Sequence, residues 1–201
     1  MYWTQLTNKQ IKMASALNLP APIERRLFLA KQVDQGSINE ISKAIIAINE
    51  DDEQLAKIYA AYDLVYEPKP IRLFIDSYGG YVYQCFGLLG IMRASKIPVH
   101  TIVTGCAMSC GFLISIAGHK RFGYPKSTYL YHQVSSGAIG KAKDLEEEVV
   151  ETLRLQKMIE DHTLEYTKIT AKKLERIYKG KKDWFIETDE ALKLGIIDEV
   201  L

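Results

Sequence analysis

A serine between a predicted strand and a predicted helix is the residue of this chain best placed for chemistry. Ser109 lies in Gly105–Gly111, a run of small residues between the β-branched segment Ile102–Thr104 and the apolar, helix-length segment Phe112–Ala117. At such a turn the first N–H groups of the helix are free and the helix dipole is positive. That environment suits a nucleophile whose attack creates an oxyanion. Small residues also allow close packing, so the turn alone leaves catalysis and packing both open.

A serine nucleophile needs a base that takes its proton and an acid that orients this base. Among the four histidines, His132 stands out because it ends a predicted apolar strand beside the glycine- and serine-containing segment Val134–Gly140. A packed polar residue at a strand end is the competing interpretation. The other histidines open a strand, follow a helix end or lie on a charged helix: His100, His119 and His162. Spacing singles out no acid among four candidates: Asp161, Asp183, Asp189 and Asp198.

Alternating strands and helices predict the framework that positions these candidates. The predicted strands are Arg26–Leu29, Ile71–Ile75, the segment from Pro98 into the serine turn, and Thr128–His132. Their alternation with helices favours an α/β fold with a largely parallel sheet. In such sheets function collects at the carboxyl ends of the strands, where both Ser109 and the turn Asp76–Gly80 fall.

Local signals place the helices. Ser37 suits the N-cap of a helix with isoleucines at helical spacing, and an acidic break at Asn49–Glu53 separates it from a second segment that reaches Tyr66. The remaining helices, the last of them capped by Thr188, are predicted at Val82–Arg93, Ala142–Tyr166, Thr170–Gly180 and Asp189–Leu194.

The domain organisation is simple. Residues 1–22 are predicted to form a peripheral N-terminal arm, and residues 23–201 a single domain. The helix Ala142–Tyr166 is longer than a core of this size needs. We expect it to leave the body of the domain and to contact another subunit.

Composition excludes several classes of protein. The 26 lysines and arginines nearly balance the 25 acidic residues, which argues against a broad nucleic-acid surface. Three cysteines match neither a disulfide framework nor a zinc pattern and favour a reducing cytoplasm: Cys85, Cys106 and Cys110. No stretch approaches the roughly 20 apolar residues of a membrane span, and the N-terminus lacks a signal-peptide core.

Several segments, taken in order, resemble ClpP, the proteolytic subunit of the Clp protease. Gly105–Gly111 resembles the G-x-A-x-S-x-G nucleophile segment of that family, and Tyr131–Gln133 resembles its histidine motif. Asp183–Phe185 and the following Glu190–Asp198 resemble its catalytic aspartate and C-terminal signature. Asp76–Gly80 resembles its oxyanion loop. Together these matches are specific, whereas each alone is weak.

The resemblance covers about residues 23–201 and implies both a fold and a set of roles. The fold is the ClpP/crotonase-like α/β superfold, with repeated β-β-α units around a largely parallel sheet and a protruding handle helix within about residues 134–169. The implied catalytic residues are the nucleophile Ser109, the general base His132 and the orienting Asp183. The backbone N–H groups of Gly80 and Cys110 would form the oxyanion hole.

The resemblance also implies an assembly. Members of the family stack two rings of seven subunits through their handle helices and enclose the serines in a chamber. An AAA+ unfoldase feeds them unfolded polypeptides in cytoplasmic protein quality control. The partner uses the ATP, so the resemblance implies neither a cofactor nor a metal ion in this chain.

Three departures from the family pattern keep alternatives open. Tyr78 stands where the family usually has proline, extra residues lie within Asp51–Pro70, and the N-terminal arm differs from the family's axial loops. The main alternatives are a phage-type head maturation protease of the same superfamily and a catalytically silent ring subunit. A crotonase-like acyl-CoA enzyme shares the superfold but needs no Ser-His-Asp set.

Overall fold

A computed structural model describes residues 17–201, so residues 1–16 of the predicted N-terminal arm lie outside the described residues. Thirteen elements follow one another within the described range: β1 (Arg26–Leu29), α2 (Gln35–Ala60), β2 (Ile71–Ser77), α3 (Val82–Ala94), β3 (Val99–Met108), α4 (Cys110–Ile116), β4 (Lys120–Gly123), β5 (Thr128–Tyr131), α5 (Ala142–Tyr166), α6 (Ala171–Gly180), β6 (Trp184–Glu187), α7 (Thr188–Lys193) and β7 (Glu199–Val200).

One sheet of seven strands organises the described chain. Its main path runs β1-β2-β3-β4-β7, while β5 leaves this path to pair with β3 and β6. Every pairing is parallel except that of β5 with β6, which is antiparallel. The α/β fold with a largely parallel sheet is therefore confirmed.

Strand β3 has two successive partners on one of its edges. Its first half, His100–Val103, pairs with β4, and its second half, Cys106–Met108, pairs with β5. On its other edge the pairing with β2 shifts register between Ile75 and Ser77. The predicted end of this strand at Thr104 is wrong, because pairing with β5 keeps the chain extended as far as Met108.

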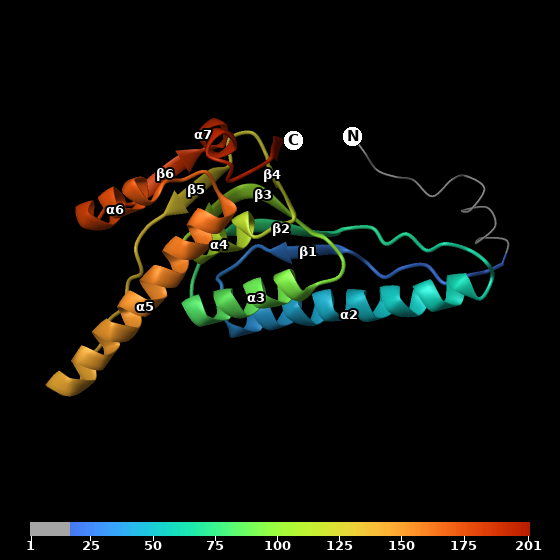
Figure 1. Ribbon diagram of the computed structural model, residues 1–201, viewed down its shortest axis with the longest axis horizontal. Coiled ribbons are helices and arrows are strands. Elements are labelled where there is room, and N and C mark those ends of the chain that lie inside the picture. The colour runs from blue at the N-terminus through green and yellow to red at the C-terminus, as the bar shows by residue number, and fades with distance from the viewer. Residues whose placement is uncertain (1–16) are drawn as a thin grey trace.

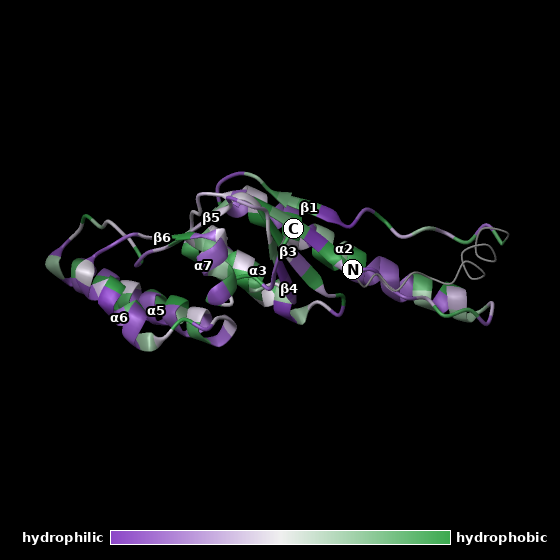
Figure 2. Cartoon of the chain, turned by 90° about the horizontal axis from the view of Figure 1, so that it is seen from above, coloured by the Kyte–Doolittle hydropathy of each residue, from purple (hydrophilic) through white to green (hydrophobic). Residues whose placement is uncertain are grey.

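Helices α2 and α3 lie side by side below β1 and β2 in Figure 1, and their buried isoleucines and leucines belong to the main core. All seven residues of α4 are buried. In Figure 2 the central strands and α3 are mostly hydrophobic, whereas α5 and α6 carry mixed colours. Helices α2 and α5 project from opposite ends of the body in both views (Figures 1 and 2).

Two predicted features of the first helix are wrong. Its N-cap is Asp34 rather than Ser37, since the Asp34 carboxylate accepts the N–H of Ser37 at 2.8 Å and the Ser37 hydroxyl accepts the N–H of Asp34 at 3.0 Å. The acidic segment Asn49–Glu53 does not break the helix either, because α2 continues through it and ends at Ala60. No second helical segment reaches Tyr66 within the described chain.

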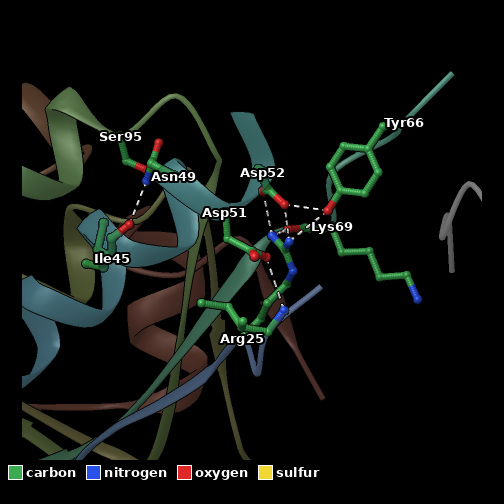
Figure 3. Close-up of polar contacts among 9 residues, drawn as sticks. Arg25, Ile45, Asn49, Asp51, Asp52, Tyr66, Lys69 and Ser95 are labelled. Carbon is green, nitrogen blue, oxygen red and sulfur yellow. Dashed lines mark hydrogen bonds and ion pairs between the residues drawn. The ribbon is translucent and has the colours of Figure 1, made fainter. Parts of the chain in front are cut away.

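A buried ion pair explains why the acidic segment stays helical. Asp52 is 3% exposed and accepts hydrogen bonds from both terminal nitrogens of the Arg25 guanidinium and from the Tyr66 hydroxyl (Figure 3). Arg25 also donates to the carbonyl of Lys69 at 2.9 Å. A second small apolar cluster lies beside this network, formed by Leu55 and Tyr59 with Leu19, Leu64 and Tyr66. The extension of α2 therefore has its own polar and apolar contacts.

Two features of the C-terminal half also differ from the prediction. Thr188 does not cap α7, whose N-cap is Glu187. The Thr188 hydroxyl instead donates to the carbonyl of Ser127 at 2.9 Å. Strand β4 was not predicted, because its four residues include two basic side chains and carry no alternating pattern. In contrast, the long helix is confirmed with its predicted bounds, Ala142–Tyr166.

Candidate active site

Ser109 occupies a strained turn. Its φ is 53° and its ψ is −121°, values that residues other than glycine rarely adopt. Its N–H donates to the carbonyl of Leu130 on β5 at 2.9 Å, so this turn is attached to the neighbouring strand. Strain of this kind persists only where surrounding structure imposes it, and a nucleophile on a sharp strand-to-helix turn is one established use.

The glycine pair after β2 packs directly against this turn. A Cβ on Gly79 would lie 2.7 Å from both the Met108 carbonyl oxygen and the Ser109 Cβ. Gly79 has a φ of 95° and Gly80 a φ of 154°, both in the region that favours glycine. A Cβ on Gly80 would meet the carbonyl oxygen of Val33 at 2.1 Å. Glycine is thus required at both positions, and the loop lies in contact with Ser109.

Strand register places His132 and Asp183 at the same edge of the sheet. Met108 is opposite Leu130 in the parallel ladder of β3 and β5, so Ser109 and His132 both follow paired strand ends. In the antiparallel ladder of β5 and β6, Tyr131 is opposite Trp184. The next residues outward are His132 and Asp183, which the antiparallel register therefore sets opposite each other. Strand β5 ends at Tyr131, one residue before the predicted end.

A small cavity lies at this edge. Its volume is about 50 Å³, enough for a few water molecules, and both Ser109 and His132 line it. The other lining residues are Gly80, Val82, Phe112, Leu113, Tyr131, Gln133, Val134, Ser135 and Ile159. The cavity therefore combines the predicted nucleophile and base with an apolar wall from α4 and α5.

The three predicted triad side chains are not joined to one another. Among the described residues, no hydrogen bond links the side chains of Ser109, His132 and Asp183. His132 is half-buried, whereas Asp183 is exposed and does not line the cavity. The fold thus brings the three residues to one edge of the sheet, but in the single chain their side chains are not hydrogen-bonded to one another.

Comparison with known proteins identifies the family. The family model described as Clp protease matches residues 12–201. The chain belongs to the Clp protease family. It is similar to an ATP-dependent Clp protease proteolytic subunit of Deinococcus radiodurans, with 31% identity over 180 residues that cover 89% of this chain and 80% of the relative.

Two further relatives have similar names. The ATP-dependent Clp protease proteolytic subunit 2 of Prochlorococcus marinus is 32% identical over 181 residues, which cover 89% of this chain and 82% of the relative. A proteolytic subunit of Porphyromonas gingivalis is 30% identical over 203 residues, which cover 98% of this chain and 81% of the relative. Membership of the Clp protease family confirms the predicted fold and the predicted class, a ClpP-type peptidase and hence a hydrolase.

The other candidate histidines and aspartates of this Clp protease family member have structural explanations. His119 Nδ1 accepts the N–H of Val99 at 3.1 Å, and His162 Nε2 bonds the carbonyl oxygen of Leu113 at 3.0 Å. Burial lowers the pKa of both His162 and His100. The remaining acids lie in ion pairs or in a helix first turn: Asp161 with Lys157, Asp198 with Arg121, and Asp189 in α7. None of these side chains lines the cavity at Ser109.

Two cysteines lie directly behind the serine turn. The Cys110 thiol donates to the carbonyl of Gly80 at 3.2 Å, and the Cys85 thiol donates to the carbonyl of Cys110 at 3.6 Å. Burial raises the pKa of the Cys85 thiol well above its usual value. Burial and the Asp76 carboxylate raise the pKa of Cys106 to about 11. The thiols of Cys85 and Cys106 therefore stay protonated near neutral pH and pack as small apolar groups. The pKa of Cys110 is instead lowered, chiefly by a hydrogen bond from Cys85.

Residues 17–201 carry no sign of a metal site or of a membrane-spanning helix. In this part of the chain no group of three or more histidine, cysteine, aspartate or glutamate side chains is arranged to hold a metal ion. None of the helices described there combines the length and the apolar character that a membrane crossing needs.

Two residues beside the site, Gln156 and Tyr131, had no predicted role, although Tyr131 begins the segment that resembles the histidine motif. Tyr131 is 2% exposed, and its hydroxyl is buried without a hydrogen-bond partner. Gln156 is 6% exposed on α5 and accepts the N–H of Val134 at 2.9 Å. A buried glutamine on a charged helix carries no sequence signal, because its partner is set by tertiary packing.

Proposed function

We propose that the protein is a serine endopeptidase that hydrolyses peptide bonds of unfolded polypeptides. Ser109 is the nucleophile, His132 the general base, and Asp183 orients the imidazole and stabilises its charged form. The observation that carries this proposal is the strand register, which sets Ser109 beside the end of β5 and sets His132 opposite Asp183. The strained backbone of Ser109 and membership of the Clp protease family support it.

The chemistry follows from these positions. The Ser109 hydroxyl oxygen attacks the scissile carbonyl carbon while its proton passes to His132. The oxygen of the tetrahedral intermediate becomes negative, and the N–H groups of Gly80 and Cys110 donate to it. Collapse breaks the C–N bond, and His132 returns the proton to the leaving amine. Water then attacks the acyl carbon while His132 takes its proton, the bond to the Ser109 oxygen breaks, and His132 returns the proton to that oxygen.

We further propose that assembly completes the site. His132 and Asp183 flank the segment that contains α5, so a change in the position of this helix acts on both residues. Apolar side chains along the first half of α5 are exposed in the single chain: Leu145, Val149, Val150 and Leu153. Contacts of these side chains with a second copy would build the stacked heptameric rings that the family forms, and would fix α5.

The remaining parts of the proposal concern the surroundings of the enzyme. We expect an AAA+ unfoldase to deliver the polypeptide substrate and to use the ATP, with no cofactor bound to this chain. We place the protein in the cytoplasm, where thiols stay reduced, because Cys85, Cys106 and Cys110 are all free.

A catalytically silent ring subunit is the second candidate function. The exposed Asp183 and the absence of hydrogen bonds among the three described side chains favour it. A silent subunit would keep the fold and the ring contacts but would not form an acyl-enzyme.

Hydrolysis of a short fluorogenic peptide by size-fractionated protein, without any ATPase, separates the two candidates. We expect activity only in a large oligomer of the wild type and none in Ser109→Ala of the same mass. The Ser109 side chain makes no capping hydrogen bond to α4, so the substitution should leave assembly intact. If no fraction is active, a serine-directed β-lactone probe decides: labelling of Ser109 supports the peptidase, and its absence supports the silent subunit.

A further inference from the structure

Gln156 lies at the point where α5 leaves the body of the protein. The only buried residues among the 25 of this helix are Leu155, Gln156, Ile159 and Thr163. Leu153, just before this group, is 51% exposed, so the helix passes from solvent into the body at Gln156. A glutamine at such a boundary must find partners for its amide, because burying an unpaired amide is costly.

Both ends of the Gln156 amide are engaged. Its oxygen accepts the backbone N–H of Val134 at 2.9 Å, and its nitrogen donates to the Glu160 carboxylate at 2.7 Å. Glu160 lies one turn further along the same helix, so it holds the amide nitrogen and thereby turns the oxygen toward Val134. The bond from Glu160 to the amide nitrogen therefore keeps the amide oxygen facing the N–H of Val134.

This bond fixes the chain immediately after His132. Val134 is the second residue after the histidine, lines the same cavity and packs against the main core. On the other side of His132, Tyr131 packs edge-on against Phe112 of α4, with ring centroids 5.9 Å apart. The histidine backbone is thus held at one end by the helix that follows Ser109 and at the other by α5.

Other contacts between α5 and this segment are weaker constraints. The Ser136 and Thr152 hydroxyls lie 3.0 Å apart, but Ser136 is exposed, Thr152 is only half-buried, and Ser136 lies two residues beyond Val134 in the chain. The buried Tyr131 hydroxyl makes no hydrogen bond of ordinary geometry, and burial, together with the charge of nearby Glu160, raises its pKa. The nearby Gln156 side chain acts in the opposite direction and lowers this pKa, while the amide keeps its bonds to Val134 and Glu160.

We propose that Gln156 is a positioning residue for His132 and that it transmits the position of α5 to the catalytic base. This inference rests on the proposed function, because it assumes that His132 accepts the proton of Ser109. When contacts with a second copy hold α5 in place, Gln156 holds the backbone of Val134. The His132 imidazole is then restricted to one orientation. Without the bond, the segment after His132 loses its attachment to the buried part of the helix.

The test compares three variants with the wild type as size-fractionated oligomers. Gln156→Leu keeps the volume and removes the acceptor. The exchange Gln156→Glu with Glu160→Gln keeps the net charge, restores an acceptor for Val134 and keeps a bond between positions 156 and 160. Thr152→Val removes the exposed contact with Ser136 one turn earlier on the same helix, and so controls for a general effect of changing α5.

We expect Gln156→Leu to lower kcat for a fluorogenic peptide about tenfold with KM changed less than about twofold, because the base and not the binding surface is displaced. The exchange variant should recover most of kcat, and Thr152→Val should remain within about twofold of the wild type. Hydrogen exchange at the Val134 amide should be faster in Gln156→Leu and slow again in the exchange variant.

Several outcomes would overturn the inference. A kcat of Gln156→Leu equal to that of the wild type would overturn it. So would an exchange variant whose kcat is no higher than that of Gln156→Leu. A loss of activity that only follows a loss of oligomer would show a role in assembly instead. A wild type that β-lactone labels no better than Ser109→Ala would refute the proposed function itself, and with it the role of Gln156, whatever the Val134 amide shows.

Discussion

Alanine in place of Gly79 is the sharpest test of the contact between the glycine loop after β2 and the serine turn. The new Cβ would lie 2.7 Å from the Met108 oxygen, 2.7 Å from the Ser109 Cβ and 3.0 Å from the Cys110 nitrogen. These are backbone and Cβ atoms of one tight turn, so no flexible side chain can move aside. The loop and the turn must separate by several tenths of an ångström.

The energetic cost has two parts. The φ of 95° penalises any residue with a Cβ by about 1–2 kcal/mol. Forcing extra volume into a packed site costs about 1–3 kcal/mol. We therefore expect Gly79→Ala to lower the free energy of unfolding by about 3 kcal/mol. Because the shift would move the N–H groups of Gly80 and Cys110 out of the proposed oxyanion hole, we also expect kcat to fall at least about 100-fold.

Gly87→Ala provides the matched control. Gly87 lies within α3, and a Cβ there would meet no atom within 4 Å. Alanine at this position should raise the free energy of unfolding by about 0.5–1 kcal/mol and leave activity unchanged. Urea denaturation and peptide hydrolysis measure both quantities. If Gly79→Ala matched the control in stability and activity, the close approach of loop and turn would be refuted.

Two further predictions concern stability away from the site. Asp52→Ala leaves the Arg25 guanidinium buried without its carboxylate, and we expect urea denaturation to show a loss of about 3–5 kcal/mol. Glu53→Ala removes only exposed pairs with Lys57 and Lys96 and should cost less than about 1 kcal/mol, so equal losses would contradict the buried pair. The second prediction concerns Asp198. Burial alone would raise the pKa of its carboxyl, but hydrogen bonds from Arg121 hold this pKa below its usual value. A lowered folded-state pKa stabilises the protein above the unfolded pKa of about 3.9, and this contribution is lost as pH falls through the folded pKa. The stability of Asp198→Asn should therefore decline less on acidification below about pH 4 than that of the wild type, and parallel declines would exclude this contribution.

Local signals in the sequence were sufficient for much of the framework. Thr170 caps α6 as predicted and accepts the N–H of Lys173, and the bounds of α5 follow from its composition. The serine turn could be found because small residues between a β-branched and an apolar run are a local pattern. The edge shared by Ser109, His132 and Asp183 followed from the family motifs rather than from spacing.

The errors arise where a distant residue decides local structure. Asn49–Glu53 looks like a break, but Asp52 is buried by Arg25, which lies 27 positions away. Gly105–Met108 looks like a bend, but pairing with β5 extends it into β3. Gln156 could not be found for the same reason, since its partner Val134 is 22 positions away. In each case the deciding contact is absent from any local window of sequence.

The change of partner along β3 has a consequence for the length of the chain. Between Val103 and Cys106 the strand leaves β4 and joins β5, and on its other edge Val103 and Ala107 are paired with Ile75 and Ser77. Four steps on β3 thus match two steps on β2. Deleting one residue of Thr104–Cys106 would turn every later side chain of the strand to the opposite face. Ser109 would then emerge on the side of the sheet away from His132. The connection between α2 and β2 can vary in length, but this stretch acts as a spacer with a fixed number of residues.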